Sequence, residues 1–229
     1  MTPFPDNLSY IKAEISWLDR VITKAVARQR QITHEINKVA KTATDRATAH
    51  WWYGFVTLDP AQGGREVPKE QPSPCVRISD RIQKSKEAGV FLALPELCQH
   101  FKLNEFEKNV ILLGLAPEIA RRYEKLFMIL NEDDTNARLP TIDLALRLFS
   151  KNDKEWQVNR LSFLTNGKLL KKRIIKILKR EMTIPTFLGQ CYKIEEKYVH
   201  FLLGEHKSLA PILPRPRKQK AANSGDVCA

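Results

Sequence analysis

Apolar side chains recur at alternating spacings of three and four residues along the first part of the chain. This spacing places them on one stripe of an α-helix. A single polar residue, Gln29, interrupts the stripe, and no Gly or Pro occurs between Asp6 and Trp52. The pattern therefore predicts a long amphipathic helix over residues 1–47. Its stripe comprises Leu8, Ile11, Ile15, Leu18, Ile22, Ala25, Gln29, Ile32, Ile36, Val39 and Ala43.

Two interpretations of this helix stay open. In the first, the stripe packs against the rest of the chain. In the second, residues 8–43 form a coiled coil that makes the protein a homo-oligomer, with Gln29 setting the register.

Aromatic residues and then Gly and Pro residues follow the helix. Trp51, Trp52, Tyr53 and Phe55 lie close together, and four prolines and two glycines occur over residues 60–74. Such a composition does not sustain a regular element. We predict an irregular linker over residues 48–77, whose aromatic cluster packs the helix onto the core or forms a docking patch.

Start and stop signals divide residues 92–149 into several short helices. Asn104 with Glu107 three residues later is typical of a capping box. Pro117 predicts the end of one helix and the first turn of the next. Thr141 predicts the N-cap of a further helix. The helix after Pro117 should carry one apolar stripe, made of Ile119, Tyr123, Leu126, Phe127 and Leu130.

The pattern changes after residue 150. Residues 154–164 predict a short amphipathic helix with Trp156, Leu161, Phe163 and Leu164 as its apolar side. Residues 169–178 and 186–194 predict two strands of one hairpin, and Glu195 to Leu203 predict a helix that Gly204 ends. The pattern alone predicts a mainly α domain with one small β-hairpin, followed by a disordered basic tail over residues 210–229.

The segments FKLNEFEKNVILLGLAPEIARRYEKLFMILNEDDTNARLPTIDLALRLF and KYVHFLLG carry a family resemblance. They resemble the variant winged-helix region that precedes the ATPase module in certain bacterial AAA+ ATPases, some of them encoded with contractile-injection-type particles. The resemblance implies a variant winged-helix domain over residues 78–209 behind the long N-terminal helix. The matching positions are Leu103, Phe106, Glu107, Leu112, Leu113, Ala116, Pro117, Glu118, Tyr123, Leu126, Leu130, Asp133, Asp134, Pro140, Thr141 and residues 144–148.

Charge is distributed unevenly over the 229 residues. The net charge is +12, but residues 91–150 hold 7 basic and 9 acidic side chains, whereas residues 151–204 hold 12 and 5. The first residues lack a secretory signal pattern, and no apolar run reaches the roughly 20 residues that span a bilayer. Four dispersed cysteines suit a reducing compartment. We therefore expect a cytoplasmic protein with no membrane partner.

The residues for nucleotide or metal chemistry are missing from this sequence. Gly167-Lys168 is the only Gly-Lys pair and lacks the remaining positions of a Walker A loop. The acidic trio Glu132, Asp133 and Asp134 suits a solvated turn, and no His or Cys spacing suits a metal. We expect no cofactor, no metal and no enzyme. Where an ATPase module acts with this chain, it is expected from a missing or separately encoded part, so the chain is a truncated, split or free-standing form.

A basic set is the one positive functional indication. Three interpretations stay open: contact with nucleic acid, in which the preceding helix enters the major groove; protection of an edge strand; and docking of an acidic protein. The preferred function is an accessory region of an AAA+ ATPase that contacts an AAA+ module or assembly component. The alternative is a DNA-binding winged-helix regulator. The candidate contact residues are Gln157, Arg160, Lys168, Lys171, Lys172, Arg173, Lys176, Lys179 and Arg180.

Overall fold

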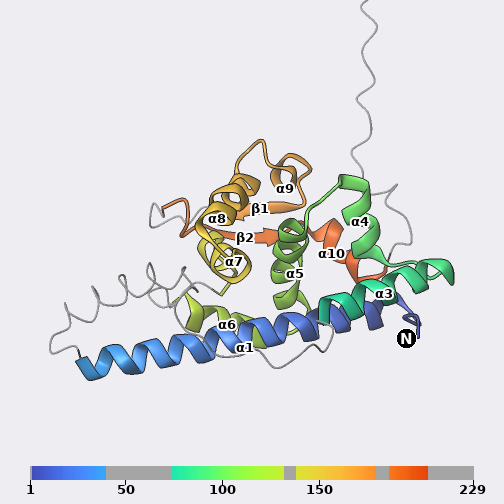
Figure 1. Cartoon of the computed structure of the whole chain (residues 1–229). Coiled ribbons are helices and arrows are strands. Elements are labelled where there is room, and N and C mark those ends of the chain that lie inside the picture. The colour runs from blue at the N-terminus through green and yellow to red at the C-terminus, as the bar shows by residue number, and fades with distance from the viewer. Residues whose placement is uncertain (1, 40–73, 132–137, 179–185, 206–229) are drawn as a thin grey trace, which may run out of the picture.

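Figure 1 shows the computed structural model, which describes residues 2–39, 74–131, 138–178 and 186–205. The first elements are α1 (Asn7–Val39), α3 (Pro74–Glu87), α4 (Ala93–Phe101), α5 (Glu105–Ile119), α6 (Arg122–Leu130) and α7 (Ile142–Phe149). They are followed by α8 (Asp153–Arg160), the 3₁₀ turn η1 (Leu161–Phe163), α9 (Lys168–Lys171), β1 (Ile175–Leu178), β2 (Cys191–Ile194) and α10 (Glu196–Leu203). The predicted fold class, mainly α with a long N-terminal helix and one small hairpin, is confirmed.

Several predicted features lie outside the described residues. These are the end of the N-terminal helix after Val39, linker residues 48–73, the acidic trio 132–134, the basic residues Lys179 and Arg180, and the tail 210–229. The first turn of α3 falls within the segment predicted as linker, because that helix already begins at Pro74.

Helix α1 runs along one side of the molecule and contacts α3, α5, α6, α7 and α10 (Figure 1). Its inward stripe belongs to the same apolar cluster as the rest of the core. The packed-helix interpretation therefore holds for residues 11–26, while Leu8 lies off the stripe and is 45% exposed. The buried apolar residues of α1 are Tyr10, Ile11, Ile15, Leu18, Ile22 and Val26.

Two carboxylates fix α1 to the helices beneath it. Glu14, which is 2% exposed, accepts hydrogen bonds from the Tyr10 hydroxyl at 2.7 Å and from Nζ of Lys108 on α5 at 2.6 Å. Asp19 accepts from Nη2 of Arg122 and from the hydroxyl of Tyr123 on α6, both at 2.6 Å. These bonds form at only one rotation of α1 about its axis and one position along that axis. They therefore fix how α1 is placed on the domain.

Helix α5 is the centre of the core, and its residues from Val110 to Ala116 are all buried. The predicted capping box is confirmed, since Oδ1 of Asn104 accepts from the Glu107 amide and the Glu107 carboxylate accepts from the Asn104 amide. The prediction for Pro117 is wrong: α5 continues to Ile119, because a proline in the last turn removes only its own amide donor and Ala120 still donates to Ala116. Ile119 consequently leaves the predicted stripe of the next helix and is 40% exposed.

The sheet is smaller than the sequence pattern predicts. Strands β1 and β2 pair antiparallel over four residues each, and Thr141 forms an isolated antiparallel bridge to Cys191 on the other side of β2. The predicted strand over residues 169–178 is wrong for residues 169–174, because Leu169 is buried within the single turn of α9 and Arg173 has a positive φ, so β1 begins only at Ile175. Residues 186–190 are not strand either, since the carbonyls of Leu188 and Gln190 accept from the first amides of α7.

Strand β2 packs tightly against α5. A Cβ placed on Gly114 would lie 3.0 Å from Cγ1 of Ile194 and 3.3 Å from the ring of Tyr192. The Tyr192 hydroxyl donates to the carbonyl of Val110 at 3.2 Å. This close approach seats the hairpin on the core, and Lys176 and Lys193 are its exposed residues. None of the described helices is long and apolar enough to cross a membrane.

Candidate functional site

Helix α8 lies at the surface and is followed along the chain by η1, α9 and the hairpin. Helix α7 contacts both α1 and α8, and Figure 1 shows α8 on the far side of α7 from α1. Asn152 caps α8 by accepting from the amide of Glu155, whose carboxylate accepts from the amide of Lys151. No residue of α8 is buried, so this helix is available to a partner.

Three apolar side chains are exposed on α8 and the turns after it. Val158 is 63% exposed, Leu161 55% and Leu164 39%. We call these three residues the α8 stripe. Exposed apolar residues that lie together are typical of protein contact surfaces, whereas scattered ones carry no such meaning. Val158 lies in the last turn of α8, Leu161 begins the 3₁₀ turn, and Leu164 follows that turn with an extended backbone.

The predicted apolar side of this helix is partly wrong. Trp156 and Phe163 do pack against the core, but Leu161 and Leu164 point outward. The reason is the change from α-helix to 3₁₀ turn after Arg160, which alters the angle between successive residues and sends Phe163 inward. A helical pattern extended through residue 164 cannot show this change.

The polar residues predicted to read DNA bases differ in availability. Gln157 is exposed. Asn159 donates from Nδ2 to Oγ of Ser150 at 3.1 Å, and the guanidinium of Arg160 lies over the ring of Phe187, 4.9 Å from its centre. Only Gln157 is therefore wholly free for a base contact in this arrangement.

The predicted basic residues divide into two groups. Lys168 is held within the chain, since its Nζ donates to the carbonyl of Lys102 at 2.5 Å and lies 3.7 Å from Oε2 of Glu107. Lys171, Lys172 and Arg173 are exposed at the end of α9. The sequence did not indicate that α9 lies next to the end of α4, because Lys102 is about 70 residues away along the chain.

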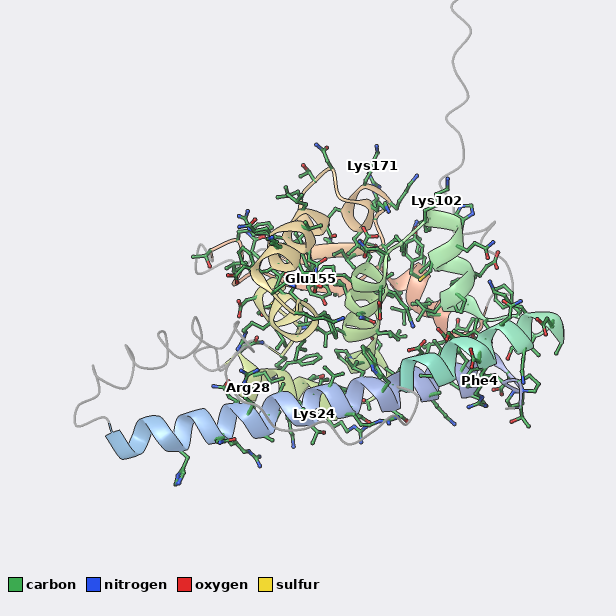
Figure 2. All side chains as sticks on the ribbon, in the orientation of Figure 1. Phe4, Lys24, Arg28, Lys102, Glu155 and Lys171 are labelled. Atoms are coloured by element: carbon green, nitrogen blue, oxygen red, sulfur yellow. The ribbon has the colours of Figure 1, made fainter. Side chains whose placement is uncertain are left out.

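Lys102, Lys171, Lys172 and Arg173 form what we call the basic corner. Figure 2 shows Lys102 and Lys171 at the same end of the molecule, away from α1. Lys102 and Arg173 are also the two described non-glycine residues with positive φ, at 52° and 53°. Each occupies the left-handed position that follows a helix, where glycine is usual because L side chains are strained there.

Two more lysines lie on the hairpin. Lys176 on β1 is directly opposite Lys193 on β2, and both are exposed. Like charges in directly opposed positions destabilise a strand pair. Lys193 extends the basic surface in a way the sequence did not indicate, because the register of the hairpin was unknown.

Among the described residues, no three His, Cys, Asp or Glu side chains group as a metal site. Cys98 and Cys191 are free thiols. Burial raises the pKa of Cys98 to about 12, so its thiol stays protonated near neutral pH.

The helices α5 to α9, the small hairpin and the closing helix α10 define a winged-helix type of domain. A family model described as "Winged helix domain, variant" matches residues 1–215, and the chain belongs to this family. The match includes α1 and every described element after it. No curated protein and no solved structure matches the chain.

Proposed function

We propose that this chain is a non-catalytic accessory region that docks another protein through the α8 stripe. The resemblance in sequence suggests the partner: the ATPase module or an assembly component of an AAA+ ATPase, with ATP hydrolysis carried out outside this chain. The observation that carries the proposal is the exposure of three large apolar side chains, Val158, Leu161 and Leu164, close together along the chain from α8 to the residue after η1.

The chemistry of α8 favours a protein partner over a base-reading role. A recognition helix places hydrogen-bonding side chains against the base edges of the major groove. Here Val158 is the most exposed large apolar residue of the stripe, and Asn159 and Arg160 have partners within the chain. Burying the stripe would remove apolar surface from water, which is favourable by roughly 25 cal/mol per Å².

A DNA-binding regulator is the second candidate, and the basic corner favours it. Lys102 and Arg173 hold positive charge at positions where glycine would be less strained. Backbone strain that persists on a charged surface is a reason to look for a function there. Phosphates would bind this corner and the hairpin lysines, without requiring base contacts from α8.

The test compares two double variants in two binding measurements. Isothermal titration with an AAA+ module encoded near this chain measures protein docking, and fluorescence anisotropy with duplex DNA over a salt series measures nucleic-acid binding. Val158→Ser with Leu161→Ser should weaken docking by at least about 10-fold, because a partner core contact is lost. Lys171→Ser with Arg173→Gly should leave docking within about 3-fold.

The opposite pattern would overturn the ranking. The second candidate would be established by a DNA affinity that rises as the salt concentration falls, that is lost in the basic-corner variant and that is unchanged in the stripe variant. Docking that survives the loss of both stripe residues would remove the α8 stripe as the docking surface.

A further inference from the structure

A cleft of about 350 Å³ opens between α1, α3, the end of α4 and the start of α5. It lies apart from the α8 stripe and the basic corner, and we call it the α1–α5 cleft. Its apolar walls come from Trp17, Ile78, Ile82 and Leu103. Its remaining lining residues are Glu14, Ser79, Cys98, Asn104, Glu105, Lys108 and Asn109.

Most of the chemically reactive groups in the cleft are already satisfied. Glu14 and Lys108 pair with each other at 2.6 Å. The pKa of Cys98 is raised to about 12 by burial, so this thiol is a poor nucleophile and a poor metal ligand. The cleft therefore suits a binding role and not a catalytic one.

Asn109 is the exception. Its side chain is 8% exposed and lines the cleft, and no partner within the described residues bonds its amide. The amide atoms of Asn109 are not cut off from solvent, so a ligand in the cleft can take the place of the water that hydrates them. An Asn amide offers one acceptor and two donors, which is the complement of a peptide group.

The rim of the cleft adds a charge. Glu105 is exposed at the start of α5 and forms no ion pair within the part of the chain that the structure describes. Since Lys108 is neutralised by Glu14, the charge that an incoming group meets is negative.

From these features we infer that the α1–α5 cleft binds an extended segment of a partner protein. One bulky apolar side chain enters between Trp17, Ile82 and Leu103, and the adjoining peptide group pairs with the Asn109 amide. A basic residue next to the apolar one faces Glu105. The volume is at the small end of ligand pockets, which fits a single anchoring side chain and not a whole cofactor. The inference adds a second docking surface, apart from the α8 stripe, and rests on the proposed function for the class of occupant, a protein.

The experiment titrates the ¹⁵N-labelled full chain with the capped dipeptide acetyl-Trp-Lys-amide and follows amide chemical shifts. We expect shifts at residues around Trp17, Leu103 and Asn109, with a Kd on the order of 1 mM for a ligand of this size. Asn109→Leu should weaken binding by about 10-fold, because the peptide group loses its hydrogen bonds. The stripe variant Val158→Ser is the matched control and should bind as the wild type does.

Two further probes separate the contributions. Acetyl-Trp-Glu-amide should bind about 2–5-fold more weakly than the lysine peptide at low salt, and Glu105→Gln should abolish that difference without touching the core. 3-Methylindole, which has no peptide group, should bind equally to wild type and Asn109→Leu.

The inference fails if no shift appears at the cleft, which is also the result expected if other residues of this chain fill it. It also fails if 3-methylindole binds as tightly as the dipeptide, or if Glu105→Gln leaves the peptide preference unchanged. These outcomes are distinct from a failure of the proposed function, since loss of docking in the α8 stripe variant is read from a different surface.

Discussion

Glu14 is the most consequential single residue of the interface between α1 and the domain. Its carboxylate is nearly inaccessible to water and depends on Tyr10 and Lys108 for compensation. Burial raises the pKa of Tyr10 above its ordinary value, and the nearby Glu14 adds to that rise, so the hydroxyl remains a donor. The free energy of a buried charge is unfavourable unless its partners are kept.

Removing the ammonium should therefore destabilise the fold. Lys108→Met is expected to lower the free energy of unfolding by about 3 kcal/mol, because it leaves Glu14 charged and without its ion pair. Urea unfolding followed by circular dichroism measures this. Lys125 is an exposed residue of α6. Lys125→Met is the control, and its free energy of unfolding is expected within about 0.5 kcal/mol of wild type. If Lys108→Met is as stable as that control, the pair does not hold α1 in place.

Gly167 is required for space and not for an unusual backbone angle. Its φ of −64° suits any residue, but a Cβ at this position would lie 2.3 Å from the carbonyl oxygen of Ser162. Gly167→Ala is expected to cost about 1–3 kcal/mol, measured as a fall in Tm. Gly89→Ala is an informative comparison, since nothing lies within 4 Å there and only its φ of 72° is strained. Equal stability of Gly167→Ala and wild type would contradict the packing of η1 against α9.

The strained residues of the basic corner predict a gain in stability. Arg173→Gly should stabilise the fold by about 0.5–1 kcal/mol, because relief of the left-handed strain exceeds the entropic cost of glycine. Lys171, two residues before Arg173, has a right-handed backbone in α9. Lys171→Gly removes the same charge there and should destabilise the fold by a similar amount. The Tm of both variants, measured by thermal melting, tests this prediction. A lower Tm for Arg173→Gly would mean that the arginine side chain stabilises the fold by more than the left-handed backbone strain destabilises it.

At the scale of elements, the helix ends were the most predictable features. Asn104 with Glu107, Thr141 and Gly204 each cap or end a helix as their chemistry indicates. These signals are local, since a cap bonds an amide two or three residues away. The helical turn that replaces the predicted strand at residues 169–171 was not predictable by the same means, because it depends on burial of Leu169 in the core.

The candidate site was only partly predictable, because its exposure depends on the packing of distant segments and not on local signals. The sequence pointed to basic residues over 168–180, and those described are all exposed, although Lys168 is bonded to the carbonyl of Lys102. The α8 stripe was missed, because apolar residues at helical spacing are usually buried. Asn152 followed by Glu155 was the available signal for where α8 begins. Nothing local marks Lys102 as a neighbour of α9.

The end of α10 should be sensitive to pH. Nδ1 of His200 lies 2.7 Å from Oε2 of Glu205, and its Nε2 lies 3.7 Å from Oε1 of Glu196. The Glu205 carboxylate, and to a lesser degree that of Glu196, raises the pKa of His200 above its usual value. The protonated form is therefore favoured in the folded state, so this contribution to stability is present below the unfolded pKa of about 6.5 and is lost as the pH rises through the folded pKa.

An NMR titration of the His200 ring measures the effect directly. Glu205→Gln should lower the pKa of His200 toward its ordinary value. The same variant should be less stable than wild type near pH 5 and indistinguishable near pH 9, where His200 is neutral in both. A pKa that does not move in Glu205→Gln would show that the carboxylate does not interact with the ring.

On the scale of the whole molecule, α1 joins elements that are distant along the chain. It contacts α3 and α5 near its start and α6 and α7 farther along, while the family match begins at residue 1. The winged-helix region and the N-terminal helix therefore share one apolar core. The α8 stripe, the basic corner and the α1–α5 cleft are three separate surfaces on that common core.

Helix α1 continues for 13 residues after the buried Val26, and Figure 1 shows this part extending past α6. At a rise of 1.5 Å per residue, the far end is a rigid spacer about 20 Å long whose base is clamped by the domain. A fluorophore on its tip would tumble with the body of the protein and report distance changes when a partner arrives. The helix thereby works as a ruler that sets Val39 about 20 Å from Val26 along its axis.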